Sequence, residues 1–263
     1  MKKVHYTANY LINPQHPVTV NLVGAGGTGS QVLTCLARLD VTLRALGHPG
    51  LHVTLYDPDE VTEANIGRQL FSDTEFGLNK AVCLISRVNN FFGNNWKAMP
   101  ELFPKLAKHA SEFNLANITI TCTDNVQSRL DMWNFLKPVS SNIKSTDYKT
   151  VLYWMDFGNS QTTGQVIIGT VPERITQPKS KLFATVESLK VITEYTQYNS
   201  ENRDESGPSC SLAEALHKQD LFINSTLAQL GCNIFWKMFR QGTIEHHGLF
   251  LNLDTMKVNP ILI

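Results

Sequence analysis

Hydrophobic and polar residues alternate in a strand-like pattern near the start of the chain. The run Pro17–Val23 leads into a glycine-rich turn, after which apolar residues recur at helical spacing from Val32 to Leu39. Leu51–Asp57 is a second strand-like run, and it ends in an acid. This order of strand, glycine turn, helix and strand predicts a βαβ unit of the dinucleotide-binding type, which begins a parallel sheet.

The alternation of strands and helices continues to the middle of the chain. Residues from Gly77 to about Phe92 are predicted to form a helix, and Ile118–Thr123 a buried strand. A further helix is expected over about Gln127 to Leu136. These elements extend the predicted parallel sheet.

The pattern changes in the second half of the chain. The remaining elements are predicted in this order: a hairpin over 151–157 and 164–169, a long polar loop over 193–208, one or two helices over 212–240, and a closing hairpin over 249–253 and 257–263. We therefore expect an α/β fold with a Rossmann-like, doubly wound sheet that is parallel at first and carries antiparallel strands in its C-terminal half. One domain over 1–263 is expected, with a nucleotide-binding half (1–140) and a second half (141–263) that carries the loop, the helix and the hairpins.

Composition and charge narrow the classes of function. The chain has 263 residues, 42% of them hydrophobic and 17% charged, with 23 basic against 23 acidic side chains. A net charge of zero gives no electrostatic reason to expect nucleic acid or an anionic membrane as partner. No segment approaches the roughly 18 to 20 continuous apolar residues of a membrane span, and the N-terminus has no apolar signal core. We expect a cytoplasmic protein.

The cysteines do not form a recognisable framework. Their number is odd, they are widely separated, and no C-x-x-C pair occurs, which argues against disulfides and against a structural zinc site. No zinc is expected. Four cysteines fall within predicted helices or a strand and are expected to be buried, whereas Cys210 stands between the polar loop and a predicted helix. The four are Cys35, Cys83, Cys122 and Cys232.

The glycine turn is the first candidate for a binding site. Gly24, Gly26 and Gly29 fit the pattern G-x-G-x-x-G, and Gly27 adds a second position of close approach. A glycine turn from a strand into a helix exposes backbone N–H groups that attract a phosphate. The alternative is a tight turn without a ligand, and the placement between strand and helix favours nucleotide binding.

Residues after the second strand separate two classes of nucleotide enzyme. The carboxylate of Asp57 can accept hydrogen bonds from both ribose hydroxyls of NAD or of ATP, or it can cap a turn. Downstream of it, Asn65, Arg68, Gln69 and Lys80 supply two amides and two cations. Hydride transfer has little use for such groups, whereas phosphoryl or nucleotidyl transfer needs its phosphate charge neutralised.

Two further side chains are candidates for chemistry. Asp124 follows a predicted parallel strand, at the edge where open α/β sheets bind ligands, and it can hold Mg²⁺ or can cap the next helix. Cys210 precedes a predicted helix, and both exposure and the helix dipole favour its thiolate form. We interpret it as a nucleophile, the alternative being an inert loop residue.

Taken together, these motifs resemble the adenylation domain of the E1-like family, which includes ThiF, MoeB and the ubiquitin-activating enzymes. The resemblance covers nearly the whole chain. Within the family, the segment 208–216 around Cys210 is most similar to the ThiF-type protein of the bacterial PRTRC gene system. The shared residues are Gly24 to Ser30, Asp57, Asn65, Arg68, Gln69, Lys80 and Thr123 to Asn125.

The resemblance implies an activity and its participants. ATP and Mg²⁺ would bind at the glycine turn, and the C-terminal glycine of a ubiquitin-like protein would be adenylated. Asp57 would hold the ribose, Asp124 the metal, and Cys210 would match the cysteine that forms a thioester in many members. Three residues would bind phosphates with Gln69 nearby, namely Asn65, Arg68 and Lys80. The family's habit also suggests a homodimer and an E2-like acceptor.

Departures from the family pattern keep other functions open. The N-terminal arginine that completes the partner's ATP site in many members is missing, because no arginine precedes Arg38. The alternatives are sulfur-carrier activation of the ThiF and MoeB type, a non-catalytic Rossmann-fold binding module, and an NAD-dependent oxidoreductase. The last of these leaves Arg68, Lys80 and Asp124 without a role.

Overall fold

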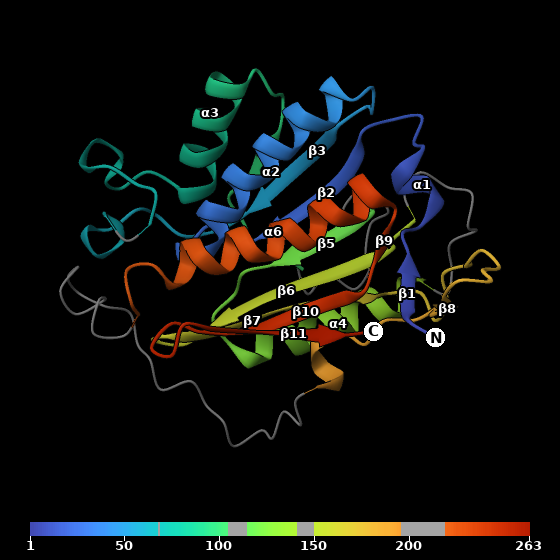
Figure 1. Cartoon of the computed structure of the whole chain (residues 1–263). Coiled ribbons are helices and arrows are strands. Elements are labelled where there is room, and N and C mark those ends of the chain that lie inside the picture. The colour runs from blue at the N-terminus through green and yellow to red at the C-terminus, as the bar shows by residue number, and fades with distance from the viewer. Residues whose placement is uncertain (68, 105–114, 141–149, 196–218) are drawn as a thin grey trace.

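The computed structural model describes residues 1–67, 69–104, 115–140, 150–195 and 219–263, with the backbone alone at 139 and 140. Within these residues, helices lie on both faces of a large central sheet, and a small second sheet lies near the N-terminus (Figure 1). The strands are β1 (Lys3–Tyr6), β2 (Val18–Val23), β3 (Leu51–Tyr56), β4 (Lys97–Met99), β5 (Ile118–Thr121), β6 (Tyr153–Asn159), β7 (Thr163–Thr170), β8 (Ala184–Thr185), β9 (Thr243–Ile244), β10 (His246–Asn252) and β11 (Lys257–Leu262).

Among the described residues, helices alternate with the strands of the first half of the chain, and a long helix, α6, lies near its end. The α-helices are α1 (Asn9–Ile12), α2 (Gly27–Ala45), α3 (Lys80–Phe92), α4 (Val126–Ser140) and α6 (Ile223–Gln241). The short 3₁₀ helices are η1 (Glu63–Asn65), η2 (Asp73–Glu75) and η4 (Ile192–Glu194). No helix among the described residues is long and apolar enough to cross a membrane.

The central sheet confirms the predicted fold class. Its order is β11-β10-β7-β6-β5-β2-β3-β4. The five strands β6-β5-β2-β3-β4 are parallel to one another. The strands β7, β10 and β11 are antiparallel to their neighbours. Four of the five parallel strands come from the first half of the chain. The fifth, β6, comes from the second half, where it pairs parallel with β5 and forms a hairpin with β7; the hairpins lie in the second half, as the sequence pattern predicts.

The strand order reverses between β2 and β5. From β2 the chain moves outward to β3 and β4, and it then returns to the other side of β2 to form β5 and β6. In open α/β sheets, ligands bind outside the carboxyl ends of the strands at such a switch point. Val23, at the end of β2, pairs with both Tyr56 and Thr121, so the segments that follow these three residues leave the sheet at one edge.

Two apolar layers hold the helices on the sheet. The helices α2, α3 and α6 cover one face, and α4 covers the other (Figure 1). Leu33 and Leu36 of α2 and Phe235 of α6 belong to the first core and are fully buried. Met132 of α4 and Trp154 of β6 belong to the second core. Burial of such side chains is the main driving force that fixes both layers.

The structure also contains elements that the sequence pattern does not predict. β1 pairs with β8 and β9 in a separate sheet of order β8-β1-β9. These strands have two to four residues, and Lys3 pairs with Ala184, so local periodicity carries no signal for them. The predicted loop over 193–208 lies outside the described residues from 196 onward, and its first residues belong to η4 and the following turn.

Candidate functional site

In the glycine turn between β2 and α2, backbone atoms leave no room for a side chain at Gly24 or Gly29. Gly24 has a φ of +95°, and a Cβ there would lie 2.7 Å from the carbonyl oxygen of Cys122. A Cβ at Gly29 would lie 1.8 Å from the carbonyl oxygen of Gly24. Gly26 faces open space, and no described side chain caps the start of α2. The first N–H groups of α2 therefore face a place that suits an anion.

The final helix covers the glycine turn from the other side. Asn224, at the start of α6, is 2% exposed, and its Oδ1 accepts a hydrogen bond of 2.8 Å from the hydroxyl of Thr28. A Cβ at Gly27 would lie 2.6 Å from the amide nitrogen of Asn224, so a side chain at position 27 would have to displace this buried amide. The sequence analysis did not identify Asn224, because its contact with Thr28 joins residues that are 196 positions apart.

Asp57 ties the end of β3 to the glycine turn. One carboxylate oxygen accepts a hydrogen bond of 2.6 Å from the N–H of Ala25, and the other accepts one of 2.9 Å from the N–H of Asp59. The side chain is buried, and this burial raises its pKa above the ordinary aspartate value. The two N–H donors and the charge of Lys80 oppose the rise. Asp57 thus joins the predicted phosphate and ribose positions directly.

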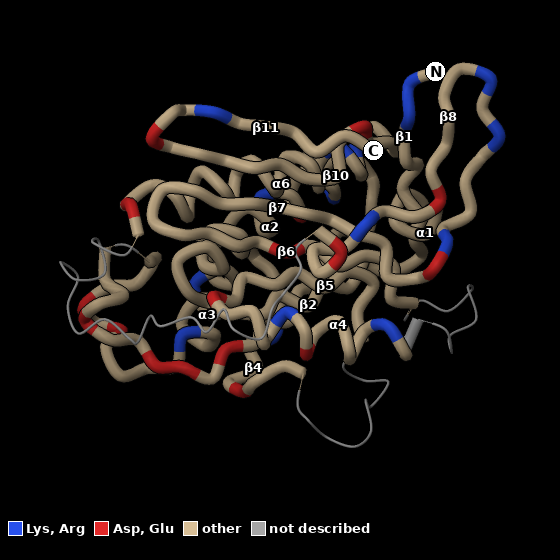
Figure 2. The backbone as a smooth tube through the Cα atoms, turned by 90° about the horizontal axis from the view of Figure 1, so that it is seen from below, with Lys and Arg blue, Asp and Glu red and all other residues tan. Residues whose placement is uncertain are grey.

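Lys80 lies at the start of α3, next to the end of β3. Its Nζ forms an ion pair of 3.2 Å with Asp59, and Lys80 is itself buried. Asn79 caps the helix by accepting from the N–H of Val82, and its amide donates to the carbonyl oxygens of Asp57 and Asp59. Acidic residues gather along the chain in the loops beside α3 and β4 (Figure 2). Lys80 is therefore a cation held close to two carboxylates, those of Asp57 and Asp59.

Asn65 and Gln69 lie in the segment after β3, and both are buried. The Oδ1 of Asn65 accepts from the N–H and the hydroxyl of Thr62, which forms a capping box for η1. The Oε1 of Gln69 is buried, and none of the described residues donates a hydrogen bond to it. The neighbouring N–H of Leu70 lies 3.5 Å from the hydroxyl of Ser30 in α2, so Gln69 is next to the first turns of that helix. A buried acceptor without a partner indicates a missing donor, such as a ligand or water.

The turn after β5 carries Asp124 to the same edge of the sheet. Asn125, and not Asp124, caps α4, because its Oδ1 accepts a hydrogen bond of 2.7 Å from the N–H of Ser128. Asp124 is exposed. The hydroxyl of Thr123 is buried and has no hydrogen-bond partner within the part of the chain that the structure describes. Since Cys122 packs against Gly24, this turn begins beside the glycine turn.

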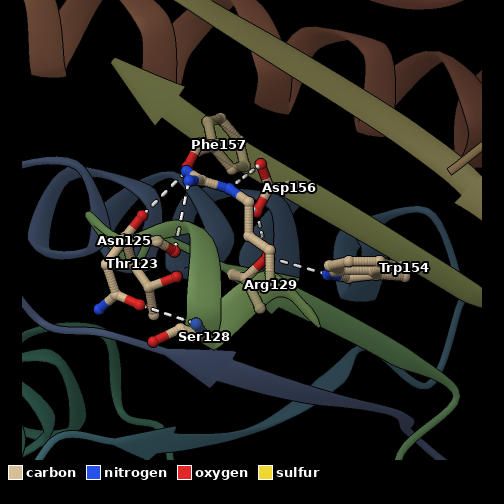
Figure 3. Close-up of polar contacts among 8 residues, drawn as sticks. Thr123, Asn125, Ser128, Arg129, Trp154, Asp156 and Phe157 are labelled. Atoms are coloured by element: carbon tan, nitrogen blue, oxygen red, sulfur yellow. Dashed lines mark hydrogen bonds and ion pairs between the residues drawn. The ribbon is translucent and has the colours of Figure 1, made fainter. Parts of the chain in front are cut away.

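A buried ion pair lies behind this turn, and the sequence analysis did not identify it (Figure 3). The Nε of Arg129 donates to both carboxylate oxygens of Asp156, at 3.1 and 2.9 Å. Asp156 also accepts from the hydroxyl of Thr121, which in turn accepts from the indole N–H of Trp154. Burial raises the pKa of Asp156, and Arg129 opposes the rise. The other guanidinium nitrogens donate to three backbone carbonyls, those of Thr123 (3.0 Å), Asn125 (3.5 Å) and Phe157 (3.3 Å).

The sequence does contain a signal for this pair. Asp156 is a single acid within the apolar run 151–157, and a carboxylate in a buried strand requires a charged or hydrogen-bonding partner. The identity of the partner needs the fold, because Arg129 stands 27 positions earlier.

Two predicted site residues, Arg68 and Cys210, lie outside the described residues. Of the other cysteines, Cys83 and Cys232 are buried, whereas Cys35 and Cys122 are partly exposed. Burial raises the pKa of Cys122 well above its ordinary value. A hydrogen bond with the Cys232 thiol lowers the pKa of Cys35, and the same contact raises the pKa of Cys232. The two thiols face each other between α2 and α6.

The structure brings most of the predicted site residues to one edge of the sheet. The glycine turn contacts Asp57 through Ala25 and packs against Cys122, and Lys80 lies close enough to Asp57 to affect its charge. Gln69 joins this edge through the start of α2. Among the described residues, no cluster of three or more His, Cys, Asp or Glu is arranged to hold a metal ion.

Comparison with known proteins supports the interpretation of the fold. The model of the ThiF family matches residues 16–240. No curated protein matches the sequence. Among solved structures, E. coli MccB is similar with a TM-score of 0.56 and 15% sequence identity, over 97% of this chain and 63% of MccB.

Two further structures extend this similarity. PaaA has a TM-score of 0.55 and 15% identity, over 94% of this chain and 64% of PaaA. A structure of E. coli MccB with ATP has a TM-score of 0.55 and 14% identity, over 97% of this chain and 65% of MccB. The chain thus spans somewhat less than two thirds of the length of these relatives, and at these identities the similarity shows the fold.

Proposed function

Because the chain belongs to the ThiF family, we propose that it is an E1-like, ATP-dependent adenylyltransferase. One observation carries the proposal: the glycine turn is hydrogen-bonded to Asp57 on one side and packed against the start of the Asp124 turn on the other. A ribose acceptor, exposed helix N–H groups and an exposed carboxylate then surround one place at the switch point of the sheet. The buried acceptor of Gln69 adds a position that a ligand can satisfy.

The proposal assigns a role to each side chain at this edge. Asp57 accepts from the ribose hydroxyls, and the N–H groups of the turn Gly24–Gly29 bind the phosphates. Asn65, Arg68 and Lys80 bind the phosphates and stabilise the charge that develops in the transition state, Asn65 as a neutral hydrogen-bond donor and the other two as cations, with Gln69 beside them. Lys80 would exchange its ion pair with Asp59 for a phosphate oxygen. Residues 1–140 form the nucleotide-binding half, and 141–263 supply the parts that receive the second substrate.

Mg²⁺ fits the residues present. It is commonly held by one or two carboxylates together with phosphate oxygens and waters, so the exposed Asp124 suffices as its protein ligand. When bound, the ion supplies positive charge that stabilises the transferring phosphoryl group. The helix cap is made by Asn125, which leaves the carboxylate of Asp124 unused for that purpose.

We propose the C-terminal glycine of a ubiquitin-like protein as the second substrate. Its carboxylate attacks the α-phosphorus of ATP, the bond to the β-phosphate breaks, and an acyl-adenylate and pyrophosphate form. The thiolate of Cys210 then attacks the acyl carbon and releases AMP, which leaves a thioester for transfer to an E2-like acceptor. MccB, which shares the fold, has been crystallised with ATP and with MccA. The segment around Cys210 favours the ThiF-type protein of the PRTRC system, and the family suggests a homodimer.

ATP–pyrophosphate exchange in the presence of a ubiquitin-like protein tests the proposal. The same protein without its terminal glycine serves as the control substrate. We expect exchange that requires this glycine, that Asp124→Ala abolishes, and that Cys210→Ala leaves unchanged while a thiol-sensitive adduct disappears. Bound ATP without any exchange would favour a non-catalytic binding module. A thiocarboxylate product with Cys210 unmodified would favour sulfur-carrier activation.

A further inference from the structure

One guanidinium group holds the turn that carries Asp124 from both sides. Arg129 donates to the carbonyl oxygen of Thr123 and to that of Asn125, the residues before and after Asp124 (Figure 3). The planar guanidinium has five N–H donors in a fixed fork, so its orientation sets the positions of several acceptors at once. The backbone of Asp124 therefore depends on where Arg129 is held.

Arg129 needs a partner to stay in this place. It lies in the first turn of α4, where the helix dipole disfavours a cation, and it is 6% exposed. Asp156 compensates for both effects, because it is 1% exposed and accepts from Nε through both of its oxygens. A buried ion pair of this kind adds little to net stability but specifies one geometry.

The sheet fixes Asp156 in turn. Thr121 and Asp156 are paired residues on the adjacent parallel strands β5 and β6, and the Thr121 hydroxyl donates to Asp156 over 2.6 Å. The backbone also leaves room for the guanidinium at Gly158, where a Cβ would lie 2.6 Å from Nη2 of Arg129. The position of Asp156 is thus set by strand register, and that of Arg129 by Asp156.

We infer that the Arg129–Asp156 pair is a positioning device that sets the orientation of Asp124 for the metal of the bound nucleotide. This inference rests on the proposed function, since it takes Asp124 as the protein ligand of Mg²⁺. Neither Arg129 nor Asp156 contacts the nucleotide. They act through the backbone of the Asp124 turn, as outer partners of metal ligands commonly do.

Arg129→Lys is the first variant to test. It keeps a cation beside Asp156, so the buried carboxylate stays compensated, but a single ammonium cannot donate to both carbonyls in the geometry of the fork. Arg44→Lys is the matched control, because Arg44 also pairs with an aspartate, Asp40, but near the far end of α2. Asp156→Asn is a second variant that removes the charge and keeps the size of the side chain.

Hydrogen–deuterium exchange of the peptide that covers 121–132 reports whether the turn is held. We expect faster exchange in Arg129→Lys and in Asp156→Asn, confined to this peptide, and exchange like that of the unchanged protein in Arg44→Lys. Unchanged exchange of the peptide in both test variants would overturn the inference. This measurement needs neither ATP nor a protein substrate.

Binding of a fluorescent ATP analogue at increasing Mg²⁺ concentrations reports whether the turn positions Asp124. We expect Arg129→Lys to raise the Mg²⁺ concentration needed for half of the metal-dependent binding by about tenfold, since outer partners of metal ligands have effects of this size. Binding without metal should be unchanged. Asp124→Asn should remove the Mg²⁺ dependence of binding. In the Asp124→Asn background, the added change Arg129→Lys should not weaken binding further.

The outcomes separate the inference from the function on which it rests. If Arg129→Lys weakens binding further in the Asp124→Asn background, or weakens it equally without metal, the pair has a general structural role and the inference is wrong. If the unchanged protein binds no ATP analogue at any Mg²⁺ concentration, the proposed function fails together with the metal role of Asp124. The exchange rates then still decide whether the pair holds the turn.

Discussion

Asp57 has two hydrogen-bonding roles, and both depend on pH because its burial shifts its pKa. It accepts hydrogen bonds from the N–H groups of Ala25 and Asp59, and in the proposed function it also accepts from the ribose. Burial raises its pKa, because the charged form loses hydration. The raised pKa means that ionisation of Asp57 disfavours the fold. The contribution of Asp57 to the free energy of unfolding is therefore fully present below the pKa that Asp57 has in the unfolded chain. It is lost as pH rises through the higher pKa that Asp57 has in the folded protein.

Binding of ATP should follow the ionised form of Asp57. As pH falls through its folded pKa, which lies above the ordinary 3.8, we expect affinity for ATP to fall, because a protonated carboxyl is a weaker acceptor. Asp57→Asn should weaken binding at neutral pH by about tenfold or more, the effect of losing a charged hydrogen bond, and should remove this pH dependence. Equilibrium titrations with ATP across the acidic range measure both effects. An undiminished pH dependence in the variant would exclude Asp57 as its source.

At the scale of elements, the contact between α2 and α6 limits which residues the glycine turn accepts. Gly27 lies against the buried amide of Asn224, whereas no atom of the described residues lies within 4 Å of a Cβ at Gly26. Glycine is therefore needed at these two neighbouring positions for different reasons. Gly27 is required by packing between helices, and Gly26 leaves space over the helix N-terminus for a ligand.

Gly27→Ala and Gly26→Ala should accordingly have different effects. We expect Gly27→Ala to destabilise the fold by about 1–3 kcal/mol, because it overpacks a buried contact, and to lower the melting temperature by several degrees. Asn224→Ala in the same chain should restore part of the loss. Gly26→Ala should have the same melting temperature as the unchanged protein but should bind ATP more weakly. Thermal unfolding and ATP titration of the same samples measure this, and equal melting temperatures of the two alanine variants would contradict the packing argument.

Elements with strong periodicity could be predicted from the sequence, and contacts between distant segments could not. β2, α2, β3, α3 and the hairpin β10–β11 follow from local patterns, as does the placement of the glycine turn and Asp57. The 3₁₀ capping box at Asn65 and the Arg129–Asp156 pair depend on how segments meet. The small sheet is missing from the sequence interpretation for the same reason, since each of its strands is too short for a pattern.

At the scale of the whole molecule, two buried histidines join this small sheet and its surroundings to the central sheet. His5 of β1 donates from Nδ1 to the carbonyl oxygen of Val186, so its Nε2 accepts from the hydroxyl of Tyr153 in β6. His247 of β10 donates likewise to the carbonyl oxygen of Ile168 and lies 2.7 Å from the hydroxyl of Tyr195. Burial lowers the pKa of both histidines, and each therefore favours its neutral form in the fold.

These histidines should make the whole fold sensitive to acid. Because their folded pKa values lie below the unfolded value of 6.5, their contribution to stability is present above pH 6.5 and is lost as pH falls through the unfolded pKa towards the folded one. Urea unfolding at pH 7.5 and at pH 5.5 should show a loss of stability that the double variant His5→Gln/His247→Gln reduces.

Gln177→Ala provides the matched control for the histidine pair. The amide of Gln177 hydrogen-bonds to both backbone groups of Tyr6 in β1, so its removal should weaken the attachment of the same strand. A glutamine side chain does not titrate, and the free energy of unfolding should therefore fall by a similar amount at both pH values. If the double histidine variant keeps the full pH dependence of the unchanged protein, the acid sensitivity comes from other groups, and the two histidines have only a packing role.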